Sequence, residues 1–220
     1  VVGMWYAITA RRKVLSISLA FLLAVLAVYL APDSWFDRIE TISSAQDDFS
    51  FMGRVTAWKV SAAIALSNPF FGGGLHAIQS LPVWQEFTQR IDFLSFIITP
   101  PPEPFARAAH SIYFEVLGDL GFVGFILFIG LIVNAFLTAR HIRRLVIGQS
   151  ELLWARDLSD GLRLALVAYC VGGAAVSLAY LELFYVVLML LEVLRQHVLV
   201  TLRERTENLI FVSGSIGKAM

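Results

Sequence analysis

Charge and cysteine are both scarce in this chain of 220 residues, and each shortage excludes a class of protein. Only 15% of the residues are charged and 58% are hydrophobic, whereas a soluble domain is about a quarter charged. The single cysteine, Cys170, can form neither an intrachain disulfide nor a CxxC metal site. The formal net charge is zero, so no excess of basic residues would attract nucleic acid. The composition therefore indicates a membrane protein.

Histidine is also sparse, with four in the chain. None has a second histidine at metal-ligand spacing, so we expect no zinc site and no cofactor. The chain starts at Val1 in the middle of a pattern, and we interpret it as the C-terminal part of a longer membrane protein.

Four apolar runs predict an all-α integral membrane protein with about four transmembrane helices. Residues 14–31 are uncharged, and a signal peptide is the alternative there because basic residues precede the run. A motif helix followed by a span is expected over 110–139, with its apolar part starting at Phe122. The remaining spans are expected over 162–180 and 183–200.

Basic residues flank these spans unevenly, which predicts their orientation. Twelve of the seventeen lie on one side, which we expect to be cytoplasmic. That side holds the flank 1–13, the loop 140–161 and the tail 201–220. Residues 32–109 then form one large, partly helical periplasmic loop, and the protein is expected to be a multi-pass protein of a bacterial inner membrane.

Within this loop, residues 51–67 are expected to form an interfacial helix. Its apolar residues recur at helical spacing: Val55, Trp58, Ala62 and Leu66. Arg54 shares a face with Trp58, and a snorkelling arginine with no chemical role is the alternative interpretation. The following NPFFGGG ends the helix, because proline cannot continue it.

Two glycine patterns follow. The amides around Gly72 and Gly74 are candidates for binding an anion, although a glycine run more often marks a tight turn. In FARAAHSIYFEVLGDLGFVGF, residues 105–125, three glycines recur every third residue and predict close helix packing: Gly118, Gly121 and Gly124. The same stretch places His110, Glu115 and Asp119 at the edge of an apolar run, where a histidine is either a helix cap or a catalytic group.

These motifs resemble the O-antigen ligase and polymerase superfamily. "HS", nine residues and "GFVG" match its His…Gly-x-x-Gly pattern, and GRVTAWKVSAAIALSNPFFGGG matches its upstream arginine, tryptophan and NP-x-x-G-x-G. The chain is most similar to the O-glycosylation ligases associated with the exosortase A system, through APDSWFDRIETI, AAHSIYFEVLGDLGFVGF and LELFYVVLMLLEVLR. The resemblance covers about residues 14–200.

The resemblance implies a metal-independent glycosyltransferase. It would move a glycan from undecaprenyl pyrophosphate to a protein hydroxyl or to lipid A-core. Arg54 would bind the pyrophosphate and His110 would act on the acceptor hydroxyl. Further substrate-binding residues are expected in the same site: Arg107, Trp58, Gly72, Gly74 and Glu115.

Three alternatives stay open. The first is a polymerase of the same superfamily, which uses the donor twice. The second is a transporter subunit, with Glu182, Glu192 and Arg195 as charges inside the membrane. The third is a membrane anchor with a periplasmic interaction loop. The expected partners are the lipid-linked donor, the acceptor and membrane lipids, and not nucleic acid.

Overall fold

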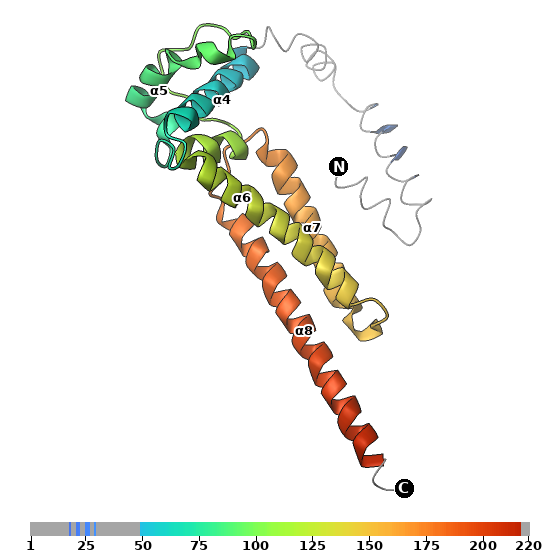
Figure 1. Cartoon of the computed structure of the whole chain (residues 1–220). Helices are drawn as coiled ribbons and strands as arrows, with labels where there is room; N and C mark the ends of the chain where they lie inside the picture. Colours follow the sequence, from blue (N-terminus) through green and yellow to red (C-terminus); the bar gives the residue numbers. More distant parts are fainter. Residues whose placement is uncertain (1–17, 19–20, 23–24, 27–28, 30–48, 217–220) are drawn as a thin grey trace. The chain divides into compact units, whose positions relative to one another are not determined.

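The computed structural model describes residues 18, 21–22, 25–26, 29 and 49–216, and within these ranges every regular element is a helix (Figure 1). The span expected over 14–31 and the start of the large loop therefore lie largely outside the described residues. Two compact units are present. The first comprises Val1–Ile126 with Val171–Ala179, and the second comprises Leu127–Cys170 with Tyr180–Met220.

The first unit is built on one central helix, α4 (Phe49–Ser67). Short elements follow it in the loop: η1 (Ala77–Gln79), α5 (Leu81–Thr88) and η2 (Ile91–Leu94). The beginning of α6 (Ile112–Leu145) completes the unit. Its core joins residues of α4 to residues of the short elements: Ala57, Val60, Ile64, Ile78, Trp84, Phe87 and Ile91.

The helix predicted over 51–67 is present, but its buried face is not the one expected. Val60 and Ile64 are fully buried, whereas Leu66 of the predicted apolar stripe is 53% exposed. Small residues such as Ala57 and Ser61 occupy the inner face and let neighbouring segments approach closely. The large apolar residues Phe51 and Leu66 are left exposed on α4.

The C-terminal end of α4 agrees with the sequence. The helix ends at Ser67, and the Asn68 amide still donates to the Ile64 carbonyl at 2.9 Å. Pro69 has no amide to continue this pattern, so the chain turns into the glycine loop. The loop contains two glycines with positive φ, Gly72 at 62° and Gly74 at 91°.

The second unit consists of the rest of α6, η3 (Ser150–Leu152), the part of α7 (Leu153–Gly173) up to Cys170, and α8 (Glu182–Ile216). An aromatic cluster joins its helices. Phe184 stacks on Tyr169 with ring centroids 4.5 Å apart and lies 5.6 Å from Phe128. At the other end of α7, the Ser159 hydroxyl donates to the Ala139 carbonyl at 3.2 Å.

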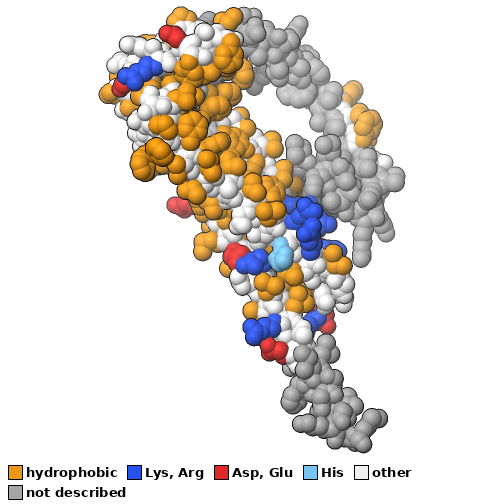
Figure 2. All heavy atoms as spheres, in the orientation of Figure 1, with side chains coloured by type: hydrophobic (Ala, Val, Ile, Leu, Met, Phe, Trp, Pro, Cys, Tyr) orange, Lys and Arg blue, Asp and Glu red, His pale blue; other side chains and the backbone are white. Residues whose placement is uncertain are grey.

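Two of the described helices are long and apolar enough to cross a membrane: α6 and the Glu182–Glu207 part of α8. Their surfaces carry many exposed large hydrophobic side chains, which appear orange in Figure 2. Exposing such apolar surface to water is unfavourable, and transferring it into the hydrocarbon of a membrane lowers the free energy. The chain therefore has the composition and the helices of a membrane protein.

The third expected span differs from the structure. Helix α7 begins at Leu153 and ends at Gly173, instead of covering 162–180, and it does not qualify as a candidate span. The N-terminal half of α7 carries two arginines and two aspartates, which are expensive in hydrocarbon: Arg156, Asp157, Asp160 and Arg163. Residues 174–181 form turns instead of continuing the helix.

Candidate functional site

The segment that precedes α6 lies along α4, and this contact assembles the candidate site. The indole Nε1 of Trp58 donates a hydrogen bond to the Ala109 carbonyl at 2.7 Å. The Trp58 ring also stacks on Phe114, with centroids 5.1 Å apart and planes 8° from parallel. Ala109 and Phe114, on either side of His110 in the chain, therefore both contact Trp58, which lies one helical turn after Arg54.

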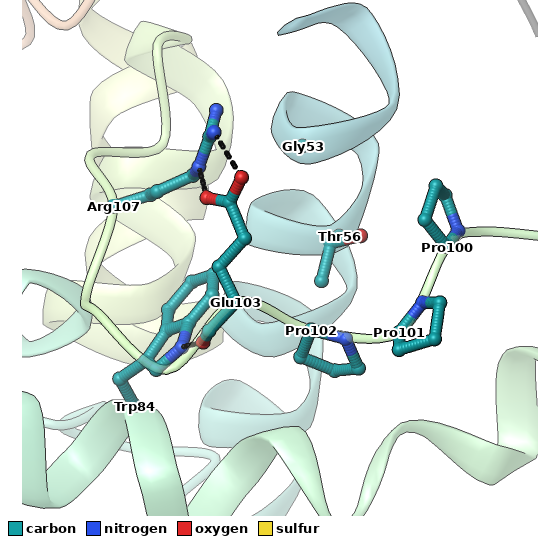
Figure 3. A pocket seen from close by; sticks show the side chains of 8 residues that line it. All are labelled: Gly53, Thr56, Trp84, Pro100, Pro101, Pro102, Glu103 and Arg107. Atoms are coloured by element: carbon teal, nitrogen blue, oxygen red, sulfur yellow. Dashed lines mark hydrogen bonds and ion pairs between the residues drawn. The ribbon is translucent and has the colours of Figure 1, made fainter. Parts of the chain in front are cut away.

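Arg107 lies directly against α4. A Cβ atom at Gly53 would come within 2.5 Å of the Arg107 Nη1 atom, so a side chain there would displace the guanidinium. The Glu103 carboxylate binds the same guanidinium in a two-pronged ion pair, with 2.7 Å between Arg107 Nη2 and Glu103 Oε1 (Figure 3). The substrate-binding role expected for Arg107 therefore competes with an internal carboxylate.

His110 is held in an uncommon backbone conformation. Its φ is 46°, and its amide donates to the Ser177 hydroxyl at 2.8 Å. Non-glycine residues rarely adopt positive φ, and those that do often belong to functional sites. The turn after α7 thus orients the backbone from which the imidazole projects.

Both arginines act on the imidazole. Burial lowers the pKa of His110 most, and the positive charges of Arg54 and Arg107 lower it further. A lowered pKa favours the neutral imidazole, which is the form that can accept a proton. The structure thus brings together Arg54, Arg107 and His110, although Arg54 is distant from the other two in sequence.

Arg54 differs from Arg107 in its partners. Within the described residues no carboxylate forms an ion pair with Arg54, although its side chain is half-buried. A half-buried guanidinium with no internal counter-ion is well suited to bind an anionic ligand, and its planar fork matches phosphate oxygens.

A cavity of about 220 Å³ adjoins this cluster (Figure 3). The cavity is lined by α4, Trp84 and the proline-rich segment: Gly53, Thr56, Trp84, Pro100, Pro101, Pro102, Glu103 and Arg107. The Trp84 indole donates to the Glu103 carbonyl at 2.8 Å, which fixes the residue that binds Arg107. The three consecutive prolines therefore form one wall of the cavity.

Lys59 fastens the start of that wall and was not anticipated from the sequence. Its ammonium donates to the Ile97 carbonyl and, at 3.2 Å, to the Thr99 hydroxyl. Burial lowers the pKa of Lys59, and the nearby Asp92 charge opposes that shift. The sequence did offer a signal for this contact: a lysine within an apolar helix needs hydrogen-bond partners if its ammonium is buried.

Glu115 has partners within the fold. Its carboxylate is buried and accepts a hydrogen bond from the Ala179 amide at 3.1 Å. The ionisable side chain beside it is His76, with 4.0 Å between His76 Nδ1 and Glu115 Oε1. Glu115 therefore connects the turn after α7 to the start of α6.

Backbone amides just after the glycine loop bind a carboxylate, and that carboxylate belongs to the chain itself. The fully buried Asp119 carboxylate accepts from the His76 amide at 2.8 Å and from the Ala77 amide at 3.1 Å. The Gly74 amide donates to the Asp119 carbonyl and the Gly72 amide to the Asn68 carbonyl, both at 2.9 Å. The amides of Gly72 and Gly74, expected to bind substrate, are thus already engaged.

The three glycines of α6 have different neighbours. A side chain at Gly118 would meet Ser61 of α4 at 3.1 Å, which is the close helix approach expected of it. Gly121 has φ 66° and breaks the helix, so that Pro69 of the glycine loop can accept a bond from the Phe122 amide at 2.8 Å. A side chain at Gly124 would meet Leu120 of the same helix.

Within the part of the chain that the structure describes, no group of three or more potential ligand residues is arranged to hold a metal ion. The cluster therefore consists of cations and an imidazole beside an all-helical scaffold. Such a cluster binds anionic groups through guanidinium charge.

The described residues thus form an all-helical protein with two candidate membrane-spanning helices and a cluster of two arginines and a histidine. The family model of the O-antigen ligase matches residues 1–129, which is more than half of the chain. The chain belongs to the O-antigen ligase family. No curated protein and no solved structure matches it.

Proposed function

We propose that the protein is a glycan ligase that moves a glycan from undecaprenyl pyrophosphate to an acceptor hydroxyl. One observation carries this proposal: Arg54 and His110, distant in sequence, lie close enough for the charge of one to lower the pKa of the other. Membership of the O-antigen ligase family supports a glycan transfer of the ligase or polymerase type. The acceptor we infer is a protein hydroxyl or lipid A-core.

In the proposed reaction the acceptor oxygen attacks the anomeric carbon of the donor glycan. The bond between that carbon and the pyrophosphate oxygen breaks, and the proton of the acceptor passes to the neutral imidazole of His110. Arg54 stabilises the negative charge that develops on the departing pyrophosphate. Arg107 adds positive charge to the same region while Glu103 holds its guanidinium in place.

The transporter and anchor alternatives receive less support. A transport pathway through Glu192 and Arg195 would not require a convergent arginine–histidine cluster in the loop. Glu192 and Arg195 instead bind each other, with 2.6 Å between Arg195 Nη2 and Glu192 Oε1. Glu182, the third charge considered for a pathway, lies in the first turn of α8 and is exposed.

The test is a transfer assay with the complete protein in proteoliposomes that contain a pyrophosphate-linked glycan donor. We expect His110→Gln and Arg54→Lys each to lower the transfer rate at least about a hundredfold, as expected for the loss of a general base or of charge stabilisation. Matched controls are His141→Gln and Arg90→Lys, whose side chains are exposed outside the cluster. These two variants should retain the wild-type rate.

The assay also separates the alternatives. A ladder of lengthened glycans formed from the donor alone would identify a polymerase. Retention of most activity by His110→Gln, at normal protein level, would refute the catalytic role of the histidine.

A further inference from the structure

The second unit contains an arginine-lined hollow that takes no part in the proposed transfer. The cavity measures about 630 Å³. Five of its seven lining residues are arginines and the other two are apolar: Phe136, Arg140, Arg143, Arg144, Ile147, Arg156 and Arg163. All of them come from α6, α7 or the turn between these helices.

The hollow carries an excess of positive charge. Asp160 lies between two of the arginines, with Oδ1 3.4 Å from Arg143 Nη1 and 4.0 Å from Arg163 Nη2. Asp157 pairs with Arg156 at 3.2 Å. The five guanidinium groups thus outnumber these two carboxylates. Across the described ranges, Arg140 and Arg144 form no ion pair with any carboxylate.

The position of the hollow along α6 matters as much as its charge. Helix α6 is a candidate membrane span, and Arg143 and Arg144 belong to its last turn. The arginines thus lie where an apolar helix ends, the depth at which lipid phosphates are found. Phe136 and Ile147 add apolar surface to the same cavity. Figure 2 shows basic side chains gathered beside hydrophobic ones in this way.

We propose that this hollow binds the headgroup of an anionic phospholipid, such as phosphatidylglycerol or cardiolipin. This inference is independent of the proposed glycan transfer. The phosphate would accept paired hydrogen bonds from the arginines, because a guanidinium matches two phosphate oxygens at once. The first carbons of the acyl chains would contact Phe136 and Ile147. A soluble polyphosphate would satisfy the charge but leave the apolar part of the hollow uncovered.

The experiment measures lipid binding to the complete protein, purified in a neutral detergent, by native mass spectrometry. The probes are phosphatidylglycerol, cardiolipin, phosphatidylcholine and inorganic pyrophosphate. The test variant is Arg140→Gln with Arg144→Gln. The control is Arg90→Gln with Arg203→Gln, which removes the same charge from two exposed residues outside the hollow.

We expect phosphatidylglycerol and cardiolipin to bind more tightly than phosphatidylcholine and pyrophosphate. The test variant should bind the two anionic lipids roughly thirtyfold more weakly, as expected for two lost arginine–headgroup contacts. The control variant should bind them as the wild type does. Both double variants should keep the wild-type helical content, which circular dichroism reports.

Three results would overturn the proposal. Equal weakening in the two double variants would show that the net charge alone attracts the lipid. Undiminished binding by the test variant would place the lipid elsewhere. Pyrophosphate binding as tight as that of cardiolipin would make the hollow a site for soluble anions.

Discussion

At the residue scale, two arginines with different partners face one histidine. Arg107 forms an ion pair with Glu103, whereas Arg54 has no carboxylate partner among the residues that the structure describes. This difference assigns the two cations different tasks in the proposed reaction. In that reaction Arg54 would bind the donor. The Glu103–Arg107 pair lines the cavity, and the Arg107 charge helps to lower the pKa of the His110 imidazole.

The lowered pKa of His110 predicts the pH dependence of transfer. A base must be deprotonated, so the rate should fall only as the pH drops below a histidine pKa that already lies under the usual 6.5. Arg107→Gln removes one of the positive charges that lower this pKa. The acid limb of the pH–rate profile should therefore move to higher pH in that variant.

The profile is measured at saturating donor, with Arg90→Gln as the control. An acid limb that stays in place in Arg107→Gln would show that Arg107 does not act on the catalytic base.

The Glu103–Arg107 pair predicts a gain of function. Glu103→Gln should free the Arg107 guanidinium to assist with the pyrophosphate, and the KM for the donor should fall several-fold. The pair is partly exposed, so its loss should cost no more than about 1 kcal/mol of stability. Glu86→Gln, which breaks the exposed pair with Arg90, is the control. A higher KM in Glu103→Gln would instead show that Glu103 positions Arg107 for binding.

At the element scale, the break in α6 at Gly121 is what allows the glycine loop to dock. The loop bonds to both sides of the break, through the Gly73 amide to the Gly118 carbonyl at 2.9 Å and through Pro69 to Phe122. Asp119, one residue before Leu120, then caps η1 through its carboxylate. A local irregularity in one helix thus organises a loop that precedes it by about forty residues in the chain.

Gly121→Ala should therefore destabilise the protein. A Cβ atom there would lie 2.6 Å from the Pro69 carbonyl oxygen, and the φ of 66° strains any residue with a side chain. We expect a loss of about 1–3 kcal/mol, measured as a lower thermal unfolding temperature in detergent. Gly130→Ala, in the same helix but with nothing within 4 Å of its Cβ position, should unfold at the wild-type temperature. Equal stability of the two variants would contradict the docking function of the break.

At the scale of the whole molecule, the two candidate spans and the distribution of arginines predict which regions share a side of the membrane. Native Cys170 is first replaced by alanine, and single cysteines are placed at the exposed residues Ser80 and Ser150. An impermeant thiol reagent applied to intact spheroplasts should label the cysteine at position 80 and not the one at position 150. Labelling of both would contradict a periplasmic loop over 32–109 and a cytoplasmic loop over 140–161.

Local patterns were sufficient for part of this molecule. The end of α4 at Asn68–Pro69 and the two long apolar helices follow from proline chemistry and from runs of hydrophobic residues, which act within a few turns of the chain. The bounds of α7 were wrong because composition alone does not show where a helix gives way to turns at Gly173. The short helix α5 and the 3₁₀ turns around it were missed for the same reason.

The site divides in the same way. The sequence determined the residue types, namely arginine, tryptophan and histidine in a recognisable spacing, because those motifs are local. Only the tertiary structure decided their partners: Glu103 binds Arg107, the Ala109 carbonyl binds Trp58, and the Asp119 carbonyl binds the Gly74 amide that was expected to bind substrate. Each of these contacts joins separate parts of the fold. Water cannot reach a buried polar group, so that group must form its hydrogen bonds with whichever partner the fold places beside it.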